Sequence, residues 1–184
     1  MQKILVTGGL GYIGSHVVVE LQKMNFEVVI IDDLSNSSLD VLGGIKKITG
    51  IKPEFEKIDL KKKLDVREFF NRHPDLDGAI HFAAVKAVGE SVNNPLKYYE
   101  NNICSLVYLL EELNKLDSPK LIFSSSCTVY GEAEKLPIAE NSPIKQAESP
   151  YGNTKIVGEQ IIKDCCEANP RLQAISLRYF NPIG

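Results

Sequence analysis

A glycine-rich turn near the start of the chain constrains the fold more than any other feature of the sequence. The segment TGGLGYIG places Gly8, Gly11 and Gly14 at three-residue intervals, directly after a short apolar run at residues 3–7. A sharp chain reversal favours glycine, because glycine tolerates positive φ. A helix that follows such a turn presents free N–H groups and the positive end of its dipole, which together can bind a pyrophosphate. A strand, a turn and a helix in this order are the context that the fingerprint requires, although a tight turn that binds nothing can have the same sequence.

Strand-like and helical segments alternate along the rest of the chain. Apolar runs rich in β-branched residues, without polar alternation, are typical of strands buried on both faces. We predict strands at residues 3–7, 27–31, 52–58, 78–84, 120–126 and 172–180, and helices at 12–24, 38–49, 65–73, 95–116 and 149–169. The polar segment 132–150 is predicted to be an irregular surface segment. The alternation predicts an α/β fold, a Rossmann-type doubly wound parallel sheet with helices on both faces.

Composition and charge exclude several classes of function. A chain of 184 residues with 43% hydrophobic and 24% charged residues fits one ordinary globular domain. The net charge of −3 argues against nucleic acid as the main partner. No apolar run reaches the length that spans a membrane, and no secretory signal is visible, so we expect a cytoplasmic protein with no membrane partner.

The cysteines and histidines do not predict a metal site. The four cysteines form no C-x-x-C pair, and Cys165 and Cys166 are adjacent, so reduced thiols are the expected state. His16, His73 and His81 stand far apart in the sequence, and we interpret each as structural.

An acidic residue at the end of the second predicted strand indicates which dinucleotide would bind. Asp32 lies 18 residues after Gly14. A carboxylate at about this distance accepts hydrogen bonds from the adenosine ribose hydroxyls and would repel the extra phosphate of NADP. The pattern therefore favours NAD. The alternative is that Asp32 and Asp33 merely begin a turn.

Ser126, Tyr151 and Lys155 are candidate catalytic residues. Ser126 ends the fifth predicted strand, at the edge of the sheet where this architecture binds substrate. Ser149 and Pro150 predict a helix start, so Tyr151 and Lys155 lie one turn apart on the same helix face. The tyrosine and lysine pair has little meaning by itself, since so short a pattern also arises by chance.

The chemistry expected of these residues is acid–base catalysis. A free tyrosine has a pKa near 10, and a nearby ammonium together with the cationic nicotinamide would lower it. The Tyr151 phenolate could then remove a hydroxyl proton while NAD takes hydride, with Ser126 bonded to the same oxygen. The alternatives are strand-end capping for Ser126 and a solvated helix position for Lys155.

Seven segments of the chain resemble one known family. They are TGGLGYIGSH, DDLSNS, HFAAVKAVGES, PLKYYENN, FSSSCTVYG, SPYGNTK and LRYFNPIG. Over essentially all 184 residues the chain resembles the extended short-chain dehydrogenase/reductases, and within them the enzymes that interconvert UDP-glucose and UDP-galactose. The resemblance implies a reversible, NAD-dependent oxidation at sugar carbon 4, in which the 4-keto sugar turns over before hydride returns to its other face.

The resemblance also implies roles for individual residues. The implied cofactor-binding residues are Gly8, Gly11, Tyr12, Ile13, Gly14, Asp32, Asp59, Leu60, Phe82, Ala83, Lys86, Asn101, Tyr151, Lys155 and Tyr179. The implied substrate contacts are Lys86, Ser126, Tyr151, Phe180 and Asn181, and the catalytic set is Ser126, Tyr151 and Lys155.

The same resemblance carries expectations about the rest of the enzyme. It implies that residues 1–184 are the NAD-binding domain, that a smaller substrate domain is absent, that this chain alone turns over poorly, and that the full-length enzyme is a homodimer. The rivals are a 4,6-dehydratase, an epimerase of UDP-glucuronate or N-acetylhexosamines, and a non-catalytic NAD-binding module. Cys127 and Thr128 stand where the dehydratases carry an Asp-Glu pair, which weakens that rival.

Overall fold

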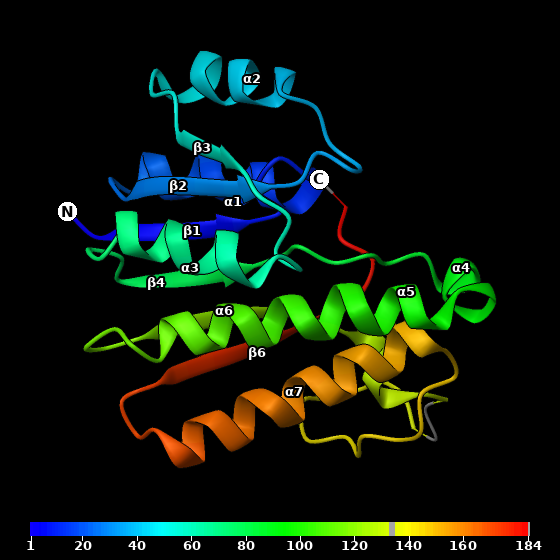
Figure 1. The fold of residues 1–184 in the computed structure, drawn as a ribbon. Coiled ribbons are helices and arrows are strands. Elements are labelled where there is room, and N and C mark those ends of the chain that lie inside the picture. Colours follow the sequence, from blue (N-terminus) through cyan, green and yellow to red (C-terminus); the bar gives the residue numbers. More distant parts are fainter. Residues whose placement is uncertain (133–134, 184) are drawn as a thin grey trace.

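A six-stranded parallel sheet forms the centre of the molecule (Figure 1). The computed structural model describes residues 1–132 and 135–183, so part of the predicted irregular segment, Ala133 and Glu134, and the final Gly184 lie outside the described residues. The strand order is β3-β2-β1-β4-β5-β6, which is the order of the dinucleotide-binding Rossmann fold. The strands are β1 (Lys3–Thr7), β2 (Glu27–Asp32), β3 (Glu54–Lys57), β4 (Gly78–His81), β5 (Lys120–Ser126) and β6 (Gln173–Tyr179). The predicted fold class is confirmed.

Helices cover both faces of the sheet and enclose two separate cores. The helices are α1 (Tyr12–Lys23), α2 (Asp40–Thr49), α3 (Lys63–Arg72), α4 (Val88–Asn93), α5 (Pro95–Tyr99), α6 (Ser105–Leu113) and α7 (Pro150–Ala168). One core, which includes Phe69, Leu109 and Ile162, packs α3, α6 and α7 against the sheet. The other, which includes Val18 and Ile45, packs α1 and α2 against the opposite face. Strands with apolar residues on both faces are buried from both sides, as their sequences predict.

The predicted helix at residues 95–116 forms, but a π-helical turn interrupts its regular α-helical geometry. The structure divides it into α5, a π-helical turn η1 (Glu100–Cys104) and α6. Such a turn inserts an extra residue into a helix and is frequent at functional sites. Within η1, Asn102 is buried and its amide bonds both backbone groups of Val85, so a tertiary contact accompanies the irregularity.

Two short elements have no counterpart in the prediction. Helix α4 carries Val88 and Val92 on exposed positions, so it lacks the apolar stripe that predicts a helix. The short helix η2 (Cys127–Tyr130) begins at Ser126, whose hydroxyl accepts a hydrogen bond from the N–H of Thr128 at 3.3 Å. Beyond β6, the chain runs past the carboxyl ends of the neighbouring strands (Figure 1).

Candidate functional site

A cleft of about 650 Å³ lies at the carboxyl ends of the strands. Its volume is within the range of pockets that hold cofactors and small ligands. Asp32, Ser126 and Tyr179, which end β2, β5 and β6, all line it. The lining includes every residue that the sequence predicts for the site: Gly8, Gly11, Tyr12, Ile13, Gly14, Asp32, Asp59, Leu60, Phe82, Ala83, Lys86, Asn101, Ser126, Tyr151, Lys155, Tyr179, Phe180 and Asn181.

The glycine turn between β1 and α1 is shaped by close backbone contacts. Gly8 has φ +66°, and a Cβ there would lie 2.7 Å from the backbone nitrogen of Ala83. A Cβ on Gly14 would lie 2.3 Å from the carbonyl oxygen of Gly8. Gly11 has φ −72° and precedes α1 without a side-chain cap. Close packing therefore favours glycine at positions 8 and 14, in addition to the positive φ of Gly8. The N-terminus of α1 lines the cleft through Gly11, Tyr12 and Ile13.

Asp32 joins the glycine turn to the loop after β2. The side chain is buried; Oδ2 accepts the backbone N–H of Leu10 at 3.1 Å, and Oδ1 accepts the N–H of Leu34 at 3.0 Å and the hydroxyl of Ser37 at 2.7 Å. Asp32 therefore holds the turn after β2, as the alternative interpretation expected. The carboxylate also lines the cleft, and each of its oxygens has more than one lone pair for hydrogen bonds.

The first two turns of α7 carry the two other catalytic candidates. The Ser149 hydroxyl caps the helix by accepting the N–H of Gly152 at 3.1 Å, and Pro150 is the first helical residue, as predicted. Lys155 is 4% exposed, and its Nζ donates to the Ser124 carbonyl at 2.7 Å. The same Nζ lies 5.8 Å from the centre of the Tyr151 ring. Lys155 is therefore not a solvated helix lysine.

Burial controls the ionisation of both residues. It raises the pKa of Tyr151 above its ordinary value, and hydrogen bonding with Ser126 acts in the opposite direction without reversing the effect. Burial lowers the pKa of Lys155 from 10.5 to about 8. Lys155 is not among the groups that shift this pKa in the protein alone, so the lowering expected from the ammonium and the nicotinamide together stays a prediction. The lysine points its Nζ at a backbone carbonyl instead of the phenol.

Sequence reasoning missed Asn102, which connects three elements around the cleft. Its amide accepts the Val85 N–H at 2.9 Å and donates to the Val85 carbonyl and to Thr154 Oγ1, both at 3.0 Å. Thr154 in turn donates to the Tyr151 carbonyl at 2.7 Å. Asn102 thus holds the loop after β4 against the first turn of α7. Two adjacent asparagines occur here, and no sequence signal tells which one is turned inward.

Sequence reasoning also missed a partly buried ion pair beside the cleft. Arg178 on β6 donates to both oxygens of Glu159 on α7, at 3.0 and 2.8 Å, and to the Tyr130 hydroxyl at 3.0 Å. The Ser125 hydroxyl donates to the same glutamate. Hydrogen bonding with Glu159 raises the pKa of Arg178 above its ordinary value. The pair ties β5, β6 and α7 together next to Ser126 and Tyr179.

The sheet order and the glycine turn, with Tyr151 and Lys155 in the same cleft, are typical of a dinucleotide-binding enzyme class. Residues 4–184 match the model of the NAD dependent epimerase/dehydratase family, and the chain belongs to this family. This assignment confirms the expected resemblance to the extended short-chain dehydrogenase/reductases.

Known relatives of the chain are UDP-sugar epimerases. UDP-glucose 4-epimerase of Neisseria meningitidis is 47% identical over 184 residues, which is 100% of this chain and 54% of that protein. The structure of the Stenotrophomonas maltophila UDP-glucose-4-epimerase with bound NAD and formylated UDP-arabinopyranose has a TM-score of 0.94 and 42% identity, over 100% of this chain and 54% of its own. The Campylobacter jejuni UDP-Glc/GlcNAc 4-epimerase has a TM-score of 0.93 and 36% identity, over 98% and 54%.

The chain spans about half the length of the curated relatives it matches. Within residues 1–132 and 135–183, no helix combines the length and apolar character needed to cross a membrane.

Proposed function

We propose that this chain is the NAD-binding domain of an enzyme that interconverts UDP-glucose and UDP-galactose by transient oxidation at sugar carbon 4. The observation that carries the proposal is the single cleft that brings the glycine turn, Asp32, Ser126, Tyr151 and Lys155 together. The relatives named UDP-glucose 4-epimerase support the choice of substrate. Neither the glycine turn nor the acid–base residues would suffice alone, because many unrelated reactions occur on this fold.

The residues of the cleft fit NAD. At Gly8 and Gly14 a Cβ has no room, so the backbone forms a tight cradle at the N-terminus of α1. Such a helix end binds pyrophosphate oxygens through backbone N–H groups. Asp32 is placed to accept ribose hydroxyls, and its negative charge disfavours an added 2′-phosphate. Asp59 and Leu60 would lie at the adenine, and Phe82, Ala83, Lys86, Asn101 and Tyr179 would line the rest of the cofactor.

NAD, when bound, supplies an acceptor for hydride from sugar carbon 4. Tyr151 is proposed to take the proton of the 4-hydroxyl, and Ser126 to hold that oxygen by a hydrogen bond. The raised pKa of Tyr151 in the protein alone leaves the phenol too weakly acidic for this task at neutral pH. A cationic ring close to the phenol would favour the phenolate, so we propose that a bound cofactor completes the base.

Lys155 is proposed to bind the cofactor ribose and to add positive charge beside Tyr151. Its pKa of about 8 means that most of it is protonated at pH 7, although the side chain is buried. Lys86, Phe180 and Asn181 line the part of the cleft that the sugar nucleotide would enter. After oxidation, rotation of the 4-keto sugar would present its other face for the return of hydride, with Tyr151 giving back the proton.

The test is Tyr151→Phe in the intact protein that contains this chain. Epimerisation of UDP-galactose should fall at least about 100-fold, because general acid–base catalysis contributes on the order of 10² to 10⁴. NAD should remain bound, since the cradle around Gly8 and Gly14 is unchanged. Tyr108→Phe is the matched control, because this phenol packs against the core outside the cleft and should be dispensable. Equal turnover by both variants would reject Tyr151 as the base.

An epimerase that also accepts N-acetylated sugars is a second candidate. The observation that favours it is the similarity to the Campylobacter jejuni UDP-Glc/GlcNAc 4-epimerase. Assaying the intact protein with UDP-galactose and with its N-acetylated analogue distinguishes the two, since only the broader enzyme converts both.

A homodimer of the full-length protein is a further proposal. The α5–α6 region and α7 pack together on one face of the sheet and would supply the shared surface. Sedimentation of the intact protein measures this directly, and a monomer at working concentration would end the proposal.

A further inference from the structure

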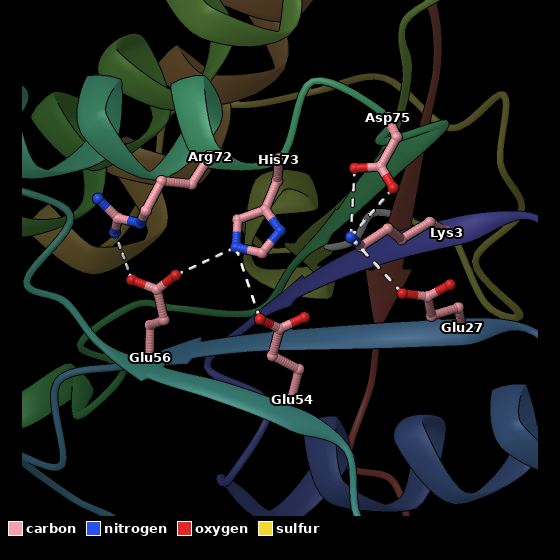
Figure 2. Close-up of polar contacts among 7 residues, drawn as sticks. All are labelled: Lys3, Glu27, Glu54, Glu56, Arg72, His73 and Asp75. Carbon is pink, nitrogen blue, oxygen red and sulfur yellow. Dashed lines mark hydrogen bonds and ion pairs between the residues drawn. The ribbon is translucent and has the colours of Figure 1, made fainter.

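A group of ionisable side chains lies beside the edge strand β3 and the end of α3 (Figure 2). Glu54 and Glu56 belong to β3, and His73 directly follows α3. None of the three lines the cleft. Their side chains converge in Figure 2, with the imidazole between the two carboxylates.

The local sequence explains why these three side chains meet. Residues two apart on a strand point to the same face, so Glu54 and Glu56 face α3 while Phe55 packs into the core on the other side. His73 is held at the end of α3 by its N–H, which bonds the Phe69 carbonyl at 3.1 Å. Its ring packs against the Phe69 ring, 4.4 Å between centres.

His73 and Glu56 form a hydrogen bond, and the three side chains also lie close enough together to share a small cation. His73 Nε2 lies 3.1 Å from Glu56 Oε1 and 3.9 Å from Glu54 Oε1. One N–H can bond only the nearer oxygen, because 3.9 Å is too long for a hydrogen bond. One ligand atom from each residue lies within 4.8 Å of the others. Ligands of a tetrahedral ion with bonds of about 2.0 to 2.2 Å lie roughly 3.3 to 3.6 Å apart, which falls between the two distances from His73.

The His73 imidazole is buried, and of its two nitrogens Nε2 has a hydrogen-bond partner and Nδ1 has none among the described residues. The His73 side chain is 7% exposed, and its Nδ1 has no hydrogen-bond partner among the residues that the structure describes. Buried polar atoms nearly always have partners, so an exception calls for an explanation. An ion on Nε2 would not satisfy Nδ1, so this unpaired nitrogen is a separate feature; Nε2 is the ring nitrogen that is aimed at the two carboxylates (Figure 2).

The side chains around the group carry a net negative charge, which favours the binding of a cation. Arg72 pairs with the second oxygen of Glu56, and Lys3 pairs with Glu27 and Asp75. The seven side chains of Figure 2 include four carboxylates and two permanent cations, so their net charge is −2 when the imidazole is neutral. Burial tends to raise the pKa of Glu56, but hydrogen bonds with Arg72 and His73 outweigh it and hold that pKa below its ordinary value. Glu56 is therefore ionised at neutral pH.

We propose that Glu54, Glu56 and His73 form a binding site for a divalent transition-metal ion, with zinc as the reference ion. An imidazole nitrogen and carboxylate oxygens are ligands that Zn²⁺ accepts in proteins. Arg72 stays on the outer oxygen of Glu56 and orients that carboxylate, as second-shell partners do in known sites. A bound ion would link the edge strand β3 to the end of α3. The proposal is independent of the epimerase chemistry, since the group lies outside the cleft.

The test is titration of the metal-free intact protein with zinc chloride, followed by calorimetry and by the NMR signals of the His73 ring. One saturable site per chain is expected, together with a shift of the His73 Nε2 resonance and a rise in the thermal midpoint of about 5 °C at 100 times Kd. Glu54→Gln should weaken binding at least about 10-fold, because it removes an exposed ligand charge without disturbing the core. His73→Gln should abolish the site.

Two controls separate this site from other zinc binding. Glu27→Gln removes another carboxylate of Figure 2 that is not a proposed ligand, and should leave the affinity unchanged. Cys165→Ser with Cys166→Ser removes a thiol pair and should also leave it unchanged. Any one of three results would overturn the proposal. They are the absence of a saturable site, equal zinc affinity of Glu54→Gln and Glu27→Gln, and loss of zinc binding only in the cysteine variant.

Discussion

Replacing Lys155 with methionine should make the protein more stable at pH 7 while removing its activity. The lysine is buried on α7, and its folded pKa is about 8 against an ordinary 10.5. Between these values the unfolded chain binds more protons than the folded one, so the stability of the wild type rises with pH through this window. Below pH 8 the burial of the charge costs about 3.4 kcal/mol, worked from 1.36 kcal/mol per pKa unit.

Methionine retains the length and apolar stem of the lysine without the charge. Its loss of the hydrogen bond to the Ser124 carbonyl costs about 1 kcal/mol. The variant should therefore gain about 2 kcal/mol in the free energy of unfolding at pH 7. At pH 10 the charge penalty of the wild type falls to about 0.8 kcal/mol, so the two proteins should have nearly equal stability.

Urea unfolding of the NAD-free protein at pH 7 and pH 10, followed by circular dichroism, measures this difference. Lys163→Met is the matched control, because Lys163 lies on the same helix with 67% of its side chain exposed. Its difference from the wild type should be small at both pH values. A Lys155→Met effect that stays constant with pH, or that matches the control, would refute the buried-charge argument.

Three further predictions test the packing around the site. Gly14→Ala should cost about 1 to 3 kcal/mol by overpacking and weaken NAD binding, because its Cβ would lie 2.3 Å from a carbonyl oxygen. Gly44→Ala, in open space on α2, is the control and should stabilise the protein by about 1 kcal/mol. Thermal melts compare the two variants, and equal effects would contradict the close contact at Gly14. Glu159→Gln should cost about 1.5 kcal/mol, because the partly buried Arg178 loses its charged partner but keeps its bonds to Tyr130 and to the Glu140 carbonyl. Urea unfolding measures this loss, and no measurable change would show the pair to be weak. His81 should stay neutral in NMR titrations from pH 8 down to pH 5, because burial lowers its pKa to about 3. The unfolded chain takes up the proton near pH 6.5, so the stability that the neutral His81 confers is lost as the pH falls from 6.5 toward 3. A His81 titration midpoint near pH 6.5 would contradict this prediction.

Much of the site was predictable because its signals are local. The glycine turn, the acid that ends β2 and the serine cap before Tyr151 each depend on a few neighbouring residues and on the strand or helix that contains them. Parallel strands bring their carboxyl ends to one edge, so these separate signals must meet once the sheet order is known. The boundaries of α3, α7 and β5 follow from the same local rules, within one or two residues.

The contacts that set the chemistry were not predictable, because they join segments far apart in the chain. Which asparagine of η1 turns inward depends on Val85 and Thr154, and those contacts exist only after α7 packs against the loop that follows β4.

Local patterns alone predict the α/β class, the glycine turn, and Asp32, Ser126, Tyr151 and Lys155 at the cleft, because periodicity and turn chemistry are properties of short segments. The other cleft residues followed only from the resemblance to a known family. The packing of the elements directs the Lys155 charge at the Ser124 carbonyl and brings two glutamates and a histidine together beside β3. Ionisation and ligand geometry depend on burial and on distances of a few ångströms, which arise only when the elements pack.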